Sequence, residues 1–100
     1  MATKNLAAPL QASAPTNFAA GAGNLITVVA NPKRAGLVIT NTHATQTASL
    51  GFGAAAVSLS GITIMAGGTY TMTEYTMYRG NIYSIASGAA TNLSIMELTA

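Results

Sequence analysis

The fold class is decided by residues 61–73, which read GITIMAGGTYTMT. Ile62 and Ile64 lie on either side of Thr63, and Tyr70 and Met72 alternate with threonines. This alternation places the apolar side chains on one face of a strand, while β-branched threonine suits the solvent face. Between the two runs, residues 66–68 (Ala-Gly-Gly) supply the positive φ that a tight reversal needs. The stretch therefore predicts two strands joined by a turn.

Similar short runs, separated by turn residues, continue on both sides of this stretch. Pro32 is preset for the second position of a turn over residues 31–34, and Leu37 and Ile39 share one face of the run that follows. No window after Asn24 has the period of a long amphipathic helix. We expect strands near residues 24–30, 35–41, 47–52, 61–65, 69–76, 81–87 and 91–98. The predicted fold class is all-β, an antiparallel sandwich or barrel of about seven short strands.

The first 23 residues differ from the rest. Pro9 and Pro15 fix φ and favour extended geometry, and the segment has neither helical nor strand periodicity. We expect residues 1–23 to form an extended or disordered arm and residues 24–100 to form a single β-sandwich domain. An arm of this length could cross a neighbouring subunit. This division predicts that the fold survives without residues 1–20.

Charge is scarce in this chain of 100 residues, which has four Lys or Arg and two Glu, whereas a typical soluble domain spends about a quarter of its residues on charge. Scattered basic residues without interleaved aromatics predict no binding of nucleic acid. No apolar stretch is long enough for a membrane-spanning helix, so we expect no membrane partner. With no cysteine, disulfides and thiolate chemistry are excluded.

Catalytic groups are few. His43 is the only histidine and there is no Asp to orient it, so a locally hydrogen-bonded turn histidine is expected. Glu74 and Glu97 are the only glutamates, and each is expected to pair with Arg34, Arg79 or a neighbour's lysine. The sequence predicts no enzyme, no cofactor and no metal site.

Two features suggest contact surfaces. In the last run, Leu93 and Ile95 take one face while Met96 and Leu98 take the other, which indicates a β-bulge, a strand tucked under the arm, or a second face covered by another subunit. Tyr75 and Tyr78 precede a turn and form a possible exposed aromatic patch, although ordinary packing would also account for them.

The order of short motifs resembles a known group of proteins. The motifs are RAGLVITN (34–41), SLGFG (49–53), IMAGG (64–68), GNIYSIA (80–86) and TNLSIME (91–97). This order is similar to small β-sandwich structural proteins of tailed bacteriophages, which serve as head decoration, head–tail or tail accessory modules. The likeness covers residues 30–98 and includes no catalytic motif.

The resemblance implies a non-enzymatic virion structural protein, first of all a capsid decoration or cement protein that stabilises the head shell. Its partners would be the major capsid protein and other copies of itself. The copies would form a homo-oligomer, for example a trimer. It would be assembled in the host cytoplasm and located on the virion, at the head surface. The alternatives are a head–tail connector, a tail or fibre-base component, or, in another class, a carbohydrate-binding module. The candidate capsid or subunit contacts are Leu6, Leu10, Phe18, Lys33, Arg34, Met96 and Leu98.

Overall fold

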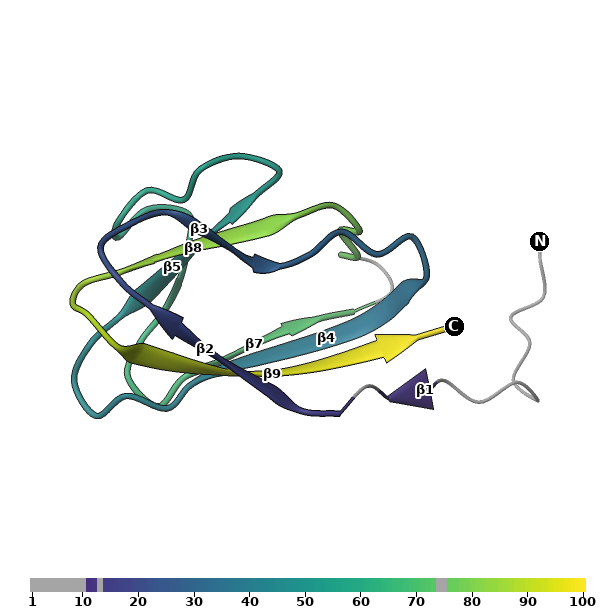
Figure 1. The fold of residues 1–100 in the computed structure, drawn as a ribbon, viewed down its shortest axis with the longest axis horizontal. Helices are drawn as coiled ribbons and strands as arrows, with labels where there is room; N and C mark the ends of the chain where they lie inside the picture. Colours follow the sequence, from purple (N-terminus) through teal and green to yellow (C-terminus); the bar gives the residue numbers. More distant parts are fainter. Residues whose placement is uncertain (1–10, 13, 74–75) are drawn as a thin grey trace.

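The structure is a computed structural model, and it describes residues 11–12, 14–73 and 76–100. The described residues form nine strands and no helix, arranged as two sheets packed face to face (Figure 1). Sheet A has the order β1-β9-β4-β7, with β2 also paired to β9, and sheet B has the order β3-β8-β5-β6. Every pairing is antiparallel. The predicted all-β sandwich is confirmed.

The seven strands expected after residue 24 are all present, within one or a few residues of the predicted ends. They are β3 (Leu25–Val28), β4 (Arg34–Asn41), β5 (Ala48–Phe52), β6 (Ile62–Ile64), β7 (Thr69–Met72), β8 (Ile82–Ala86) and β9 (Thr91–Thr99). The predicted reversals are present too. Arg34 N–H donates to Asn31 O over 3.1 Å. Gly67 has φ +76°, and Gly68 N–H closes the same turn on Met65 O over 2.8 Å.

The sandwich also includes part of the segment that the sequence assigned to a separate arm. β1 (Gln11–Ala12) and β2 (Thr16–Ala20) both pair with β9, on the edge opposite β4. Phe18 packs against the core and Ala20 is fully buried. The segment is extended, as predicted, but the fold begins no later than Gln11. Contrary to the earlier division, we therefore expect that deleting residues 1–20 destabilises the fold.

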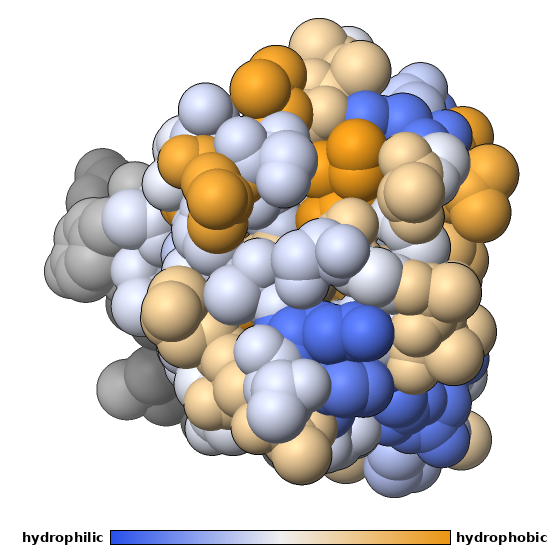
Figure 2. Space-filling view, turned by 90° about the vertical axis from the view of Figure 1, so that its left-hand side faces the viewer, coloured by the Kyte–Doolittle hydropathy of each residue, from blue (hydrophilic) through white to orange (hydrophobic). Residues whose placement is uncertain are grey.

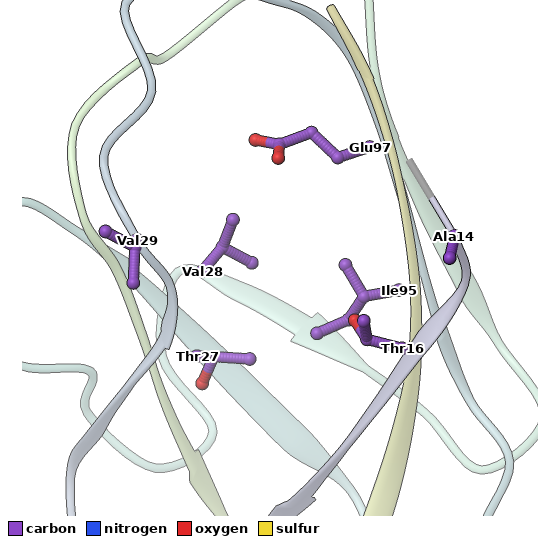
Figure 3. Close-up of a pocket in the computed structure, with 7 residues that line it drawn as sticks. All are labelled: Ala14, Thr16, Thr27, Val28, Val29, Ile95 and Glu97. Atoms are coloured by element: carbon purple, nitrogen blue, oxygen red, sulfur yellow. The ribbon is translucent and has the colours of Figure 1, made fainter. Parts of the chain in front are cut away.

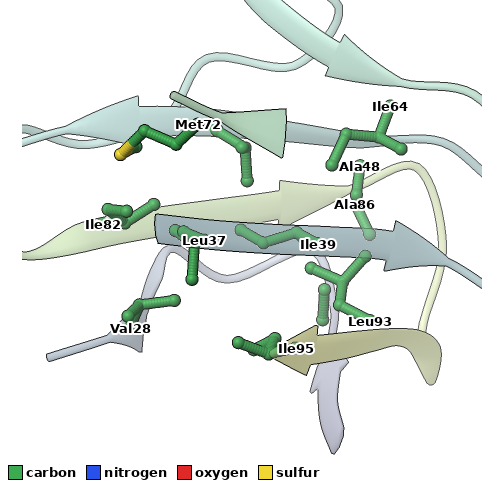
Figure 4. Packing of buried hydrophobic residues seen from close by; sticks show 12 residues of the cluster. Val28, Leu37, Ile39, Ala48, Ile64, Met72, Ile82, Ala86, Leu93 and Ile95 are labelled. Carbon is green, nitrogen blue, oxygen red and sulfur yellow. The ribbon is translucent and has the colours of Figure 1, made fainter. Parts of the chain in front are cut away.

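The core lies between the two sheets. Leu37 and Ile39 of β4 and Leu93 of β9 meet Ile82 of β8, and all four are essentially inaccessible to solvent (Figure 4). The alternation seen in the sequence therefore predicted the inward faces correctly. Burial of these branched side chains is the main stabilising term, at about 1.5–3 kcal/mol for each side chain removed from water.

The two-sided last strand has a simple explanation. Leu93 and Ile95 are buried on the inner face of β9, while Met96 and Leu98 are half-buried on the outer face of sheet A. Leu98 packs over Gly36, where an added Cβ would lie 2.9 Å from its Cδ1 atom. A bulge is present, as one alternative held, but the register shift lies at the start of the β4–β9 pairing.

Candidate contact surface

Large exposed hydrophobic residues lie in or next to the strands of sheet B. Within the described ranges none belongs to a strand of sheet A, and Val29 and Met65 lie in the loops that join β3 to β4 and β6 to β7, between the two sheets. The large exposed hydrophobic residues are Leu25, Ile26, Val29, Val57, Leu59 and Met65, with exposed fractions between 44% and 71%. We call these six residues the sheet B apolar residues. Figure 2 shows the strongly apolar side chains gathered in its upper half, the side of sheet B in Figure 1.

The loop between β5 and β6 folds back over the outer face of sheet B. Gly51 lets the loop approach, because a Cβ there would lie 2.7 Å from the backbone nitrogen of Ala56. The Asn24 side chain binds both backbone groups of Ala56. Ala56 N–H donates to Asn24 Oδ1 over 2.8 Å, and Asn24 Nδ2 donates to Ala56 O. Ser49 Oγ accepts from Leu59 N–H over 2.9 Å. These bonds fix the loop that carries Val57 and Leu59.

Leu59 is unusual in conformation as well as in exposure. Its φ is +58° and its side chain is 70% exposed. The left-handed region costs an ordinary L-residue roughly 1–2 kcal/mol, and Gly or Asn adopts it more readily. A polar residue would also be better solvated there. Leu59 thus combines a disfavoured backbone conformation with an exposed apolar side chain.

Arg34 is not a surface contact residue, and its prediction as one is wrong. The side chain is fully buried and its Nε donates to Glu97 Oε2 over 2.7 Å. The remaining guanidinium nitrogens donate to the carbonyl oxygens of Val29, Tyr78 and Gly80. The expected pairing of Glu97 with an arginine is thus confirmed. The guanidinium ties together the chain segments at this end of the sandwich, while neighbouring Lys33 is exposed.

A cavity of about 180 Å³ opens between the two sheets close to this ion pair. Figure 3 shows Val28 of β3 and Ile95 and Glu97 of β9 pointing toward it. The Glu97 side chain is 20% exposed, so water reaches the carboxylate through this opening. The lining is mostly aliphatic and hydroxyl groups, and Glu97 is its only ionisable side chain. This chemistry suits solvent better than a specific ligand.

The other predicted contacts are dispersed. Phe18 lies in β2 and packs on the core, and Met96 and Leu98 are half-buried on sheet A, away from the sheet B apolar residues. Leu6 and Leu10 lie outside the described residues. The sequence did contain a signal for the missed loop, since VSLS (57–60) puts large apolar residues between turn-forming ones.

Tyr78, one of the two residues of the predicted aromatic patch, is not an exposed ring. Tyr78 is half-buried and stacks on Phe52, with ring centroids 5.2 Å apart and planes inclined by 9°. Its hydroxyl lies where side chains at Gly53 or Gly80 would have to be, so two glycines make room for it. Tyr75 lies outside the described residues. Tyr78 is therefore a packing residue, which removes half of the surface proposed for a glycan.

His43 has the local role predicted for it. Its Nδ1 accepts from the N–H groups of Thr45 and Gln46, over 3.1 and 3.0 Å. In the parts of the chain that the structure describes, no three His, Asp or Glu side chains lie together as a metal site would require. These same residues contain no helix that could span a membrane.

Comparisons with known proteins add no relative. Neither the family models, nor the curated proteins, nor the solved structures gave a match to this chain. The physical character of the sheet B surface is thus the basis for assigning a function.

Proposed function

We propose that this chain is a non-enzymatic structural protein of a bacteriophage virion, and specifically a decoration protein that binds the head shell and stabilises it. The observation that carries the proposal is the exposure of large hydrophobic residues on β3 and on the fixed loop between β5 and β6, with none on a described strand of sheet A. Exposed apolar residues that gather on one part of a protein surface often mark a site of contact with another protein. The motif resemblance over residues 30–98 supports the phage setting.

The distribution of charge supports an assembly role. Of the described charged residues, Arg34 is buried with Glu97, so Lys33 and Arg79 remain as the exposed charges. Such a surface has little long-range repulsion to keep neighbouring subunits apart. Leu59, held in an unfavourable conformation at the tip of a fixed loop, is the side chain that we expect to enter the shell protein.

The test adds the purified protein to undecorated capsids and measures binding and shell melting. We expect binding to raise the melting temperature of the shell, and Leu59→Asn to weaken binding about tenfold or more, the effect of losing one buried leucine. Asparagine accepts the positive φ, so the fold should be retained. Ala19→Asn, at an exposed position of β2 in sheet A, is the matched control and should bind normally. No binding, or binding without stabilisation of the shell, would contradict the proposal.

A head–tail connector, tail or fibre-base role is distinguished by copy number. A shell decoration occupies many equivalent sites on the head, whereas a connector or tail component forms a single cyclic ring or a few of them. Quantifying the protein against the major capsid protein in purified particles separates these two positions. A copy number that fits one ring would overturn the decoration role and leave the structural one.

A further inference from the structure

Strand β7 ends sheet A with an open edge that has no proline, bulge or charged residue. Natural sheets discourage edge-to-edge pairing by prolines, bulges, short strands or charged residues. Pro15 interrupts the edge formed by β1 and β2, a register shift lies between Ile26 and Val28 in β3, and β6 has three residues. β7 (Thr69–Met72) is short as well, with four residues, but it contains no proline, no bulge and no charge. Its open edge is therefore able to pair with another strand.

The register within sheet A shows which backbone groups are available. Asn41 N–H donates to Gly68 O over 2.9 Å, so this position has one bond of a hydrogen-bonded pair. Such pairs alternate along an antiparallel ladder, so Tyr70 also directs its backbone groups toward β4. Thr69 and Thr71 therefore direct their N–H and C=O groups to the open edge. We call these two residues the edge threonines.

On both sides of the edge threonines, the next backbone N–H groups along the edge are already hydrogen-bonded within the chain. Gly67 N–H donates to Asn41 O over 2.9 Å, and Thr73 N–H donates to Thr76 Oγ1 over 3.0 Å. The edge donors that could extend the ladder in either direction are thus already used within the chain. In an antiparallel pairing of two β7 strands, a two-fold axis at Tyr70 is the register that uses both edge threonines of each copy. It forms four backbone hydrogen bonds.

We propose that this chain forms a two-fold symmetric dimer in which β7 pairs antiparallel with β7 of a second copy. Thr69 lies opposite the partner's Thr71, and Tyr70 lies opposite the partner's Tyr70. A second copy is the favoured occupant because an antiparallel edge is complementary to itself about a two-fold axis, and neither β7 strand carries a charge that would repel the other. A two-fold interface closes at two copies, so the product is a dimer and not a trimer.

The side chains beside the edge fit this pairing. The edge threonines are exposed on the outer face of sheet A, where Thr–Thr cross-strand pairs are favourable. On the inner side, a cavity of about 260 Å³ lined by Ile62, Ile64, Met65 and Tyr70 lies between β6 and β7. Met65, one of the sheet B apolar residues, is 61% exposed there. Because the ladder is short, we expect a dimer that dissociates on dilution and that a shared scaffold would strengthen through effective concentration.

The first test measures molar mass against protein concentration, by light scattering and sedimentation equilibrium. We expect the 10.0 kDa chain to double in mass as concentration rises. Thr71→Pro removes an edge donor without removing a bond to β4, and Thr71→Lys adds a charge to each strand. Both should leave a folded monomer, checked by circular dichroism. Asn17→Lys, on the opposite edge of the same sheet, is the control and should dimerise normally.

A second test fixes the register through the absence of cysteine from the chain. In a pairing centred on Tyr70, Tyr70→Cys places two Cα atoms about 4.5 Å apart across a non-hydrogen-bonded pair, within disulfide range. Thr69→Cys places them about 8–9 Å apart, beyond it. We expect mild oxidation to cross-link the first variant and not the second.

The outcomes that would overturn the dimer are distinct. They are a monomer at about 1 mM wild-type protein, a trimer, dimerisation retained by both folded Thr71 variants, or equal cross-linking of the two cysteine variants. The pairing needs only the isolated chain, so these results are independent of whether the protein binds a capsid.

Discussion

Replacing Arg34 by methionine tests what holds the open end of the sandwich together. Arg34 is fully buried, and its guanidinium donates to Glu97 over 2.7 Å and to Val29 O over 2.8 Å, besides two further carbonyls. Methionine fills much of the volume of the arginine stem but donates no hydrogen bond. Arg34→Met therefore leaves three carbonyl oxygens without this donor and a carboxylate without its counter-ion.

The expected cost follows from these losses. Breaking a buried ion pair by removing one partner costs about 3–5 kcal/mol. Glu97 is 20% exposed and can regain some water through the adjacent cavity, which places the expected loss near the lower end. We expect the free energy of unfolding to fall by about 3 kcal/mol, and Tm to fall by about 12 °C or more for a domain of this size.

Urea unfolding followed by circular dichroism and tyrosine fluorescence measures this loss, since the chain contains no tryptophan. Lys33→Met is the matched control: it removes the same charge from the neighbouring residue, which is exposed, and should change stability by less than about 0.5 kcal/mol. A free energy of unfolding for Arg34→Met within about 1 kcal/mol of the wild-type value would refute this reasoning. It would mean that the hydrogen bonds of Arg34 do not have the usual strength of buried bonds to a charged group.

Three further changes have defined outcomes. Burial raises the pKa of Tyr70 above its ordinary value of 10.0, so the neutral phenol is favoured in the fold. The stabilising contribution of this phenol is complete at a pH below its pKa in the unfolded chain, and it is lost as the pH rises through its pKa in the fold. Tyr70→Phe should therefore reduce the loss of stability against urea between about pH 8.5 and pH 11. Asn24→Ala should speed amide exchange in residues 54–60 while β8 stays protected, and unchanged exchange would show that the side chain does not hold the loop. Leu59→Gly should raise the stability of the isolated protein by about 0.5–1 kcal/mol in urea melts, because glycine adopts positive φ without strain; a loss of stability would mean that the leucine packs on its own fold.

The strands could be predicted because their signals are local. In GITIMAGGTYTMT, two alternating runs and a glycine turn determine the faces of Ile64 and Met72, and both side chains are buried. The same alternation placed Leu37 and Ile39 in the core. His43 was also predictable, since its bonds go to N–H groups two and three residues away.

The contact surface could not be predicted because it depends on distant partners. Arg34 follows a turn, where a charged residue is expected to lie at the surface. It is buried instead, and its carboxylate partner, Glu97, is 63 positions away in the sequence. Residues 16–20 contain little apolar periodicity, and they become a strand because β9 offers an unpaired edge. The loop that carries Val57 and Leu59 is held at Ala56 by Asn24, on the far side of β8 from β5. Sequence patterns indicate which face of a strand is apolar, but they do not indicate which distant segment covers it.

The pairing of β1 and β2 with β9 also sets how the molecule bears load. Gln11 lies opposite Thr99, so the first described strand and the last one meet at the same end of an antiparallel pair. A force that pulls these two points apart opens the backbone bonds one after another, from that end inward, whereas a force along opposite ends of the pair would strain them all together. The described part of the protein should therefore yield easily when it is pulled at Gln11 and Thr99, and resist better when it is pulled at opposite ends of the β2–β9 pair.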